Sequence, residues 1–302
     1  MIIEKAINND SEQELKNSWF ASLSLTFSLT PSGTQLTRTE RHGPLSVQKA
    51  FYPEGRDCAH IYLLHPPAGI VSGDELHINI AVKGQAHSLI TTPGANRFYR
   101  AREDHAIGDS KQVQHCKFYL AACAKCENFP LETIVYEGAD GFNTVDVHLQ
   151  NDSAYLGWDI TCLGLPSSGQ PFKHGRYSQL NRVYCQNTLI YHDRIVIKPE
   201  NKVHQHIAGL NHQSVFGTFL AYAPLGQFDD DELKALIVQL REHIISEKAG
   251  DYISISQVRR LLIIRYLGQQ AEQCKALFIQ LWQILRPLYL NKAASLPRIW
   301  HT

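Results

Sequence analysis

Alternating apolar and polar residues dominate the first two-thirds of the chain. The run S-W-F-A-S-L-S-L-T-F-S-L-T, from Ser18 to Thr30, places apolar side chains at nearly every second position, and the turn signal P-S-G follows it. This period of two is typical of a strand with one buried face. Similar runs bounded by Gly, Pro, Asn or Asp cover residues 60–65, 75–82, 86–92, 133–137, 145–149, 154–163, 182–185 and 194–198. The pattern predicts an all-β body.

The hydrophobic period changes after Pro224. Acidic residues fill positions 229–232, and apolar residues spaced by three and four follow them, which predicts a helix near Asp229–Ile245. Two strand-like runs come next, at residues 252–256 and 259–267. A second apolar stripe predicts a helix over Ala271–Leu285, ending before Pro287 because proline has no N–H group to continue it.

These elements predict a mainly β fold: a large layered or helical β-sheet body, residues 1–224, with a small C-terminal α/β unit, residues 225–302. No linker or low-complexity segment separates the two, so we expect one compact domain. The α/β unit is rich in apolar residues that fit a core contact better than a partner interface. They are Phe278, Leu281, Trp282, Leu285, Leu296, Ile299 and Trp300.

Charge and composition exclude several classes of protein. The 302 residues include 29 Lys plus Arg and 29 Asp plus Glu, so no net field favours nucleic acid or an anionic membrane. No apolar run approaches the ~20 residues that span a bilayer, and the first residues do not resemble a secretion signal. Seven scattered cysteines are typical of reduced thiols. We expect a cytoplasmic protein without nucleic-acid or membrane partners.

Two clusters hold residue types that bind metals. Cys123 and Cys126 form a C-x-x-C, but strand-like alternation would put the two thiols on opposite faces, so structural cysteines are the favoured interpretation. His204, His206 and His212 form the second cluster, in which the first two would share one face of a strand. Weak metal binding and a solvated loop both remain open for it.

Two turn sequences lie close together. H-P-P-A-G-I-V-S-G-D ends at Asp74, and T-T-P-G-A-N-R-F-Y-R contains Asn96. Proline fixes φ and glycine can adopt positive φ, so each stretch predicts a rigid turn that presents a polar side chain beside a strand. No G-x-S-x-G or phosphate loop is present.

These two stretches resemble motifs of the urease accessory protein UreD (UreH) family, H-P-P-G-G-[IV]-V-G-G-D and T-x-P-G-A-x-K-F-Y-R. Three further stretches are similar to family motifs in the same order: G-P-L-S-V-Q-K-A-F-Y-P-E, G-W-D-I-T-C-L-G and the C-terminal P-R-I-W. The chain departs from the family pattern at Leu165, where arginine is usual, and at Asn128 and Leu131, where tryptophan and glutamine are usual.

The resemblance implies a maturation factor and not an enzyme. Proteins of this family bind apo-urease and bring in UreF and the GTPase UreG, so that nickel reaches an active site with a carbamylated lysine. The expected cofactor state is transient Ni²⁺, with nothing tightly bound. The resemblance further implies that Asp74, Asn96, Asp159 and Asp193 face an internal water-filled nickel path. Ordinary buried hydrogen bonding is the competing interpretation of these four residues. A metal-dependent hydrolase using His and Asp residues is the alternative function.

Overall fold

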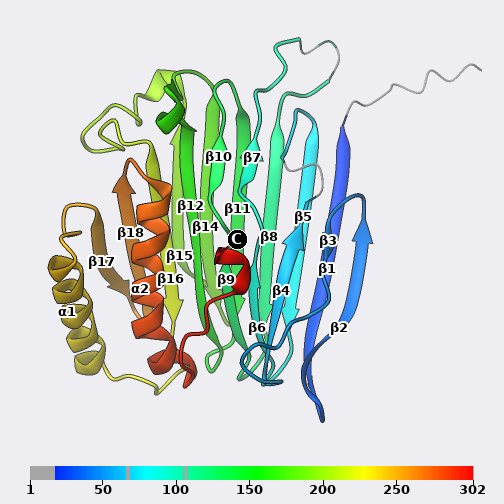
Figure 1. Ribbon diagram of the computed structural model, residues 1–302, viewed down its shortest axis with the longest axis vertical. Helices are drawn as coiled ribbons and strands as arrows, with labels where there is room; N and C mark the ends of the chain where they lie inside the picture. Colours follow the sequence, from blue (N-terminus) through cyan, green and yellow to red (C-terminus); the bar gives the residue numbers. More distant parts are fainter. Residues whose placement is uncertain (1–17, 66–68, 105, 107, 302) are drawn as a thin grey trace, which may run out of the picture.

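Two β-sheets lie face to face, and two helices cover the outer face of one of them (Figure 1). This computed structural model describes residues 18–65, 69–104, 106 and 108–301. The mainly β prediction is confirmed. None of the helices in these ranges is long and apolar enough to cross a membrane.

The first sheet has seven strands, of which the central five run parallel to one another. In spatial order they are β15 (Thr188–Ile197), β14 (Arg176–Cys185), β11 (Asp140–Leu149), β8 (Gln112–Leu120), β5 (Asp74–Val82), β1 (Trp19–Thr30) and β2 (Gly33–His42). Antiparallel hairpins form both edges.

The second sheet lies across the interior from the first. Its main path is β17 (Ile253–Val258), β18 (Leu261–Gly268), β16 (Val215–Tyr222), β12 (Ala154–Leu165), β9 (Lys125–Phe129), β6 (His87–Thr91), β4 (Cys58–Leu64) and β3 (Ser46–Val47). Two short strands, β10 (Thr133–Val135) and β13 (Gln170–Pro171), pair with β12, and a third, β7 (Asn96–Phe98), pairs with β10. Because the chain passes repeatedly from one sheet to the other, as from β4 to β5 to β6 and from β10 to β11 to β12, its central part winds as a flattened β-helix. Short 3-10 helices occur at η2 (Pro166–Ser168), η3 (Pro199–Asn201) and η4 (Arg298–His301).

Helix α1 (Asp230–Ser246) begins where its acidic first turn predicts. The Asp229 carboxylate accepts hydrogen bonds from the N–H groups of Asp231 and Glu232, and the Glu232 carboxylate accepts one from the N–H of Asp229. This capping box satisfies backbone donors that have no partner within the helix.

Helix α2 (Ala271–Leu290) extends past the predicted end, so the prediction of a stop before Pro287 is wrong. A proline removes one backbone donor, but its cost near a helix end can be offset by burial of the residues that follow. Tyr289 and Leu290 are buried in the last turn. The helix is capped by Asn291, which adopts a left-handed conformation and donates its N–H to the Pro287 carbonyl at 3.1 Å.

The apolar core has two layers. One fills the space between the sheets, and the other lies between the second sheet and the helices. Phe278, Leu281, Trp282 and Leu285 of α2 are fully buried in the second layer, which confirms the core interpretation for them. The C-terminal Trp300 closes this layer by packing beside Trp282, at a centroid distance of 5.9 Å.

A buried arginine joins α2 to the second sheet. The Arg286 side chain is fully buried and donates hydrogen bonds to both oxygens of Glu54 and both oxygens of Glu127, at 2.7–3.1 Å. Trp282, one turn earlier, donates its indole N–H to Glu127 at 2.7 Å. Two carboxylates far from α2 in the sequence therefore share one cation.

Two histidines complete this cluster. His60 bonds Glu54 at 2.6 Å, and His87 bonds Glu127 at 2.8 Å. Although burial raises the pKa of both carboxyl groups, the bonds from these histidines and from Arg286 hold each pKa below its ordinary value. Both glutamates are therefore ionised and paired in the folded protein.

Replacing Arg286 with methionine should destabilise the fold by about 3–5 kcal/mol, because two buried carboxylates lose their counter-charge. Urea denaturation followed by tryptophan fluorescence measures the effect. Arg38→Met is the control, since its ion pair with Glu40 is exposed, and it should change stability by less than about 0.5 kcal/mol. Adding Glu54→Gln and Glu127→Gln to Arg286→Met should recover part of the loss. Equal stability of Arg286→Met and wild type would contradict this account.

Candidate functional site

Asp74 closes the first of the two turns. Its Oδ2 accepts the N–H of Val71 at 2.9 Å, and its side chain is buried at the start of β5. Gly73 adopts a positive φ of 86°, as predicted, whereas Gly69 is needed for space, because a Cβ there would lie 2.3 Å from the ring of Tyr99. Pro66 and Pro67 lie outside the described residues. The contacts of Asp74 place it in the turn itself.

Asn96 begins β7 after the second turn, and its amide starts a chain of hydrogen bonds through the interior. Gly94 does not adopt the positive φ that the turn sequence allows for a glycine. The Asn96 amide donates to Gln114 at 3.2 Å, and the chain continues through Asn143, Gln179 and Asn181 at 3.0–3.2 Å. Asn181 then donates to Asp159 at 2.8 Å.

The parallel sheet explains why these amides line up. Gln114, Asn143 and Gln179 are register partners on β8, β11 and β14, so their side chains stand side by side on the inner face. The next row along the strands is Cys116, Val145 and Asn181, and the row after it, Phe118, Val147 and Val183, belongs to the apolar core. The space between the sheets therefore changes along the strands from a polar row to an apolar one.

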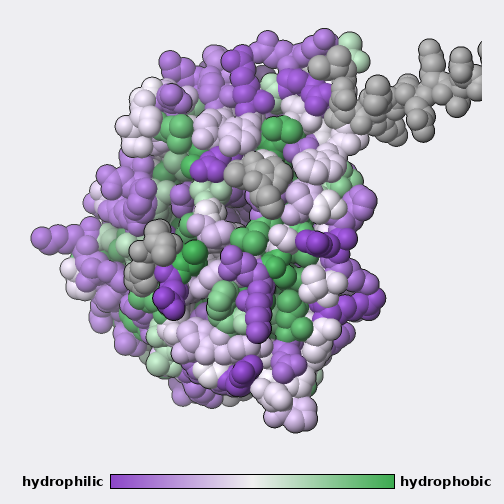
Figure 2. Space-filling view, turned by 45° about the vertical axis from the view of Figure 1, so that its right-hand side comes forward, coloured by the Kyte–Doolittle hydropathy of each residue, from purple (hydrophilic) through white to green (hydrophobic). Residues whose placement is uncertain are grey.

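A cavity of about 330 Å³ lies between the sheets next to this row. Asn96 and Asp159 both line it, together with Gln114, Asn143 and several leucines and prolines. Figure 2 shows a hollow near the centre of the view with apolar side chains around it. The structure thus brings two of the four predicted residues, Asn96 and Asp159, to one cavity.

Asp159 is the least satisfied polar group of this region. Its Oδ2 accepts the bond from Asn181, whereas its buried Oδ1 has no hydrogen-bond partner in the described part of the chain. Burial raises the pKa of Asp159 to about 7, against the effect of the Asn181 bond, and the charge of Asp193 adds to the increase. A buried carboxylate with a free oxygen can accept a proton or a cation.

A second cavity has a volume of about 790 Å³, and Asp159 is not among its lining residues. Asn181 and Asp193 line it, as does Arg265 of β18. Asp193 is paired: Arg265 lies 3.1 Å from its carboxylate, and the Tyr191 hydroxyl donates to it at 3.1 Å. Its sequence neighbour Arg194 bonds Ser178 instead. Asp74 lines neither cavity.

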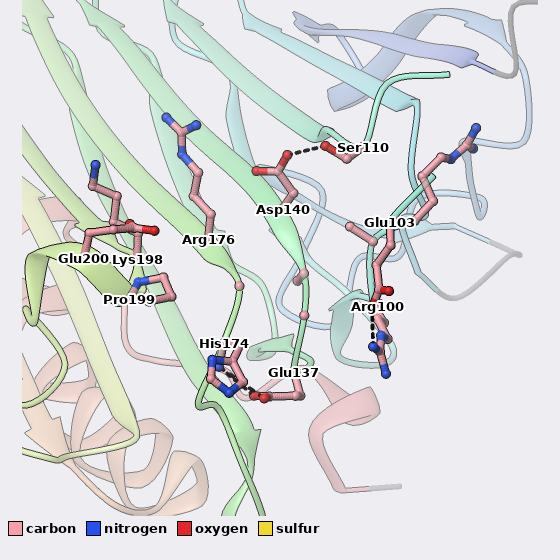
Figure 3. A pocket seen from close by; sticks show the side chains of 15 residues that line it. Arg100, Glu103, Ser110, Glu137, Asp140, His174, Arg176, Lys198, Pro199 and Glu200 are labelled. Atoms are coloured by element: carbon pink, nitrogen blue, oxygen red, sulfur yellow. Dashed lines mark hydrogen bonds and ion pairs between the residues drawn. The ribbon is translucent and has the colours of Figure 1, made fainter. Parts of the chain in front are cut away.

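A wider groove of about 890 Å³ lies where several loops meet at one end of the sheets, and sequence reasoning did not identify it. Figure 3 shows Arg176 between Lys198 and Asp140, and the Asp140 carboxylate accepts the Ser110 hydroxyl at 2.7 Å. The lining mixes both signs of charge and comes from five separate segments. No pattern within one segment could have revealed it.

The histidine cluster lies in turns, so the prediction that His204 and His206 share one face of a strand is wrong. Repeated turns between residues 202 and 212 replace the strand, with Asn211 and His212 at positive φ. His204 and His212 are near each other, with ring centroids 6.5 Å apart. Within the described ranges, no group of three close metal ligands includes any of the three histidines.

Cys123 and Cys126 occupy different environments. Cys123 is exposed at a positive φ of 57°, where its thiol contacts Asp152 at 3.2 Å. Cys126 is buried in β9, and burial raises the pKa of its thiol to about 12. Neither belongs to a group of three close metal ligands among the residues that the structure describes.

Replacing Asp159 with asparagine should stabilise the protein more at high pH than at low pH. The folded-state pKa of about 7 exceeds the ordinary 3.8, so wild-type stability falls as pH rises between these values. The gain should be larger at about pH 8 than at about pH 5.5, by roughly 2 kcal/mol. Urea midpoints at the two pH values measure it, with exposed Asp251→Asn as control. A gain independent of pH would show that Asp159 is ionised throughout.

Comparison with known proteins supports the resemblance seen in the motifs. Residues 20–301 match the UreD urease accessory protein family. A urease accessory protein UreD of Psychromonas ingrahamii is 64% identical over 293 residues, which cover 95% of each chain. Those of Marinomonas sp. and Saccharophagus degradans are 40% and 35% identical, over 94% of this chain and 90% and 93% of theirs. The chain therefore belongs to the UreD family of urease accessory proteins.

Proposed function

We propose that this urease accessory protein is a non-enzymatic scaffold that binds apo-urease together with UreF and UreG, and that Ni²⁺ passes through its interior during assembly of the urease active site. Family membership supports the accessory role over the alternative of a metal-dependent hydrolase. In this proposal nickel is a transient cargo of a cytoplasmic complex.

The observation that carries the conduit proposal is the unpartnered oxygen of Asp159, which lines the first cavity. Asp159 accepts a hydrogen bond from Asn181, which lines the second cavity, so this bond links a lining residue of one cavity to a lining residue of the other. A buried, ionised carboxylate oxygen without a hydrogen-bond partner destabilises the folded protein unless a positive charge binds near it. A partly hydrated metal cation supplies that charge.

The amide side chains of the row beside Asp159 are better suited to passing a metal ion along than to holding it tightly. Amide oxygens of Asn143, Gln179 and Asn181 are neutral oxygen donors, which replace water around a divalent cation without binding it tightly. An ion that moves between weak sites needs donors of this strength. In this proposal Asn96 contacts nickel at the first cavity and Asp193 contacts it at the second.

The role of Asp74 differs from that of the other three predicted residues. Its carboxylate accepts a backbone N–H and closes the turn before β5, so we propose that it acts by holding this turn in shape. Asp74→Ala should therefore lower stability, and Asp74→Asn, which keeps a hydrogen-bond acceptor, should restore most of it.

Replacing Asp159 with alanine should leave the complex assembled and reduce nickel loading. Co-expression with UreF, UreG and the urease subunits, followed by a pull-down, measures assembly, and metal analysis of the purified urease measures nickel. We expect normal pull-down yields and a nickel content lower by about tenfold. Asp230→Ala is the matched control, because Asp230 is exposed and lines neither cavity.

Two outcomes would contradict the proposal. Full nickel content in the Asp159→Ala complex would mean that the ion does not pass this residue. Failure of the variant to assemble would mean that Asp159 has a structural role, and the competing interpretation of ordinary buried hydrogen bonding would hold.

A further inference from the structure

The outer face of the seven-stranded sheet carries a pair of histidines. The helices pack on the other sheet, so they do not cover this face (Figure 1). His77 of β5 and His115 of β8 are register partners in the parallel pairing, and their ring centroids lie 5.8 Å apart. Both side chains are partly exposed, at 28% and 19%, so an ion in solution can reach them.

Each imidazole is held by a carboxylate through the same ring nitrogen. His77 Nε2 lies 2.6 Å from Glu75 Oε1, and His115 Nε2 lies 2.8 Å from Asp146 Oδ2. Arg182 fixes Asp146 in turn with two hydrogen bonds, at 2.7 and 2.8 Å. A ring that donates its Nε2 hydrogen to a carboxylate keeps a lone pair on Nδ1.

This arrangement matches the surroundings of histidines that bind metal ions. Such histidines donate their second N–H to a carboxylate, which fixes the ring and increases the basicity of the ligating nitrogen. Two imidazoles bound to one ion, with nitrogens at about 2.1 Å, have centroids roughly 4.5–6 Å apart. The observed spacing falls within that range.

We propose that His77 and His115 form a surface site for one divalent transition-metal ion, bound through Nδ1 of each ring. Imidazole favours Ni²⁺, Cu²⁺ and Zn²⁺ over the hard cations Mg²⁺ and Ca²⁺. With two protein ligands and water in the remaining positions, the ion exchanges readily. The site lies on the opposite face of this sheet from the inner row of amides, and it does not depend on the conduit proposed above.

The buried clusters around Cys58 are poorer candidates for a metal. Cys58, His87 and Glu127 lie close enough to share an ion, as do Glu54, Cys58 and His60. However, Arg286 already bonds both carboxylates, and burial raises the pKa of the Cys58 thiol well above its ordinary value. An ion entering there has to displace a fully buried guanidinium and remove a proton from a neutral thiol.

Titration of the purified full chain with Ni²⁺ and with Cu²⁺ tests the site. We expect His77→Ala and His115→Ala each to weaken binding of one ion by about tenfold or more, and Glu75→Gln and Asp146→Asn to weaken it less. His192→Ala is the matched control, because His192 is an exposed histidine on β15, opposite Arg182 in the strand register. The affinity of this variant for the ion should equal that of wild type.

Electron paramagnetic resonance of the Cu²⁺ form identifies the ligands directly. Wild type should show coupling to two imidazole nitrogens, and each single variant to one. Unchanged affinity and spectra in the double variant His77→Ala/His115→Ala would overturn the proposal, as would loss of the ion in Cys58→Ser alone. Repeating the titration with Asp159→Ala separates the two proposals, since that variant should keep the surface site even if the conduit proposal is wrong.

Discussion

The buried contact of Arg286 with Glu54 and Glu127 is the interaction on which the arrangement of the layers depends. Glu54 precedes β4, Glu127 lies in β9, and Arg286 lies in the last turns of α2, so one guanidinium joins three distant segments. A buried ion pair adds little stability compared with apolar packing, but its geometry admits few alternatives. Its effect is to fix where the helix lies on the sheet.

The strand that carries Glu127 also lines the inner cavity, so the contact with Arg286 helps to fix the cavity wall. Asn128, next to Glu127 on β9, points to the opposite face of the strand and lines the cavity. Trp158 of β12 also lines the cavity, and it packs against Phe129 and Trp300 at centroid distances of 4.1 and 5.7 Å. Strands β9 and β12 therefore line the cavity on one face and contact the helical layer on the other.

The sequence was sufficient for features that arise from local periodicity. The alternation before Thr30 predicted β1, and the acidic start at Asp229 predicted α1, because each depends on neighbours within a few residues. The strand β16 had no such signal, since all eight of its residues are buried and nothing alternates. At His204 and His206 the sequence left a strand face and a solvated loop both open, because a short alternating run does not reveal positive φ at later residues.

Residues far apart in the chain account for what could not be predicted at the sites. Arg286 is 232 residues from Glu54 and 159 from Glu127, and nothing local links them. Family motifs identified Asp159 and Asn96, but not the row of Gln114, Asn143 and Gln179 between them. That row exists only because parallel strands place these residues in one register. The pair of His77 and His115 depends on the same registration.

The protein treats its buried carboxylates in two opposite ways. Glu54 and Glu127 have histidine and arginine partners, and their pKa values fall below the ordinary range, so both favour the folded state above the pKa of the unfolded chain. Asp159 has one amide partner and a free oxygen, and its raised pKa means that ionisation opposes folding near neutral pH. A neighbouring arginine would offset this cost, and Asp193 has such a neighbour in Arg265, 3.1 Å from its carboxylate. Among the described residues that line the cavity beside Asp159, Arg97 is the one arginine. It belongs to β7, at the opposite end of the amide row from Asp159. Ionised Asp159 therefore lowers the stability of the folded protein. A cation bound to its free oxygen would offset this cost.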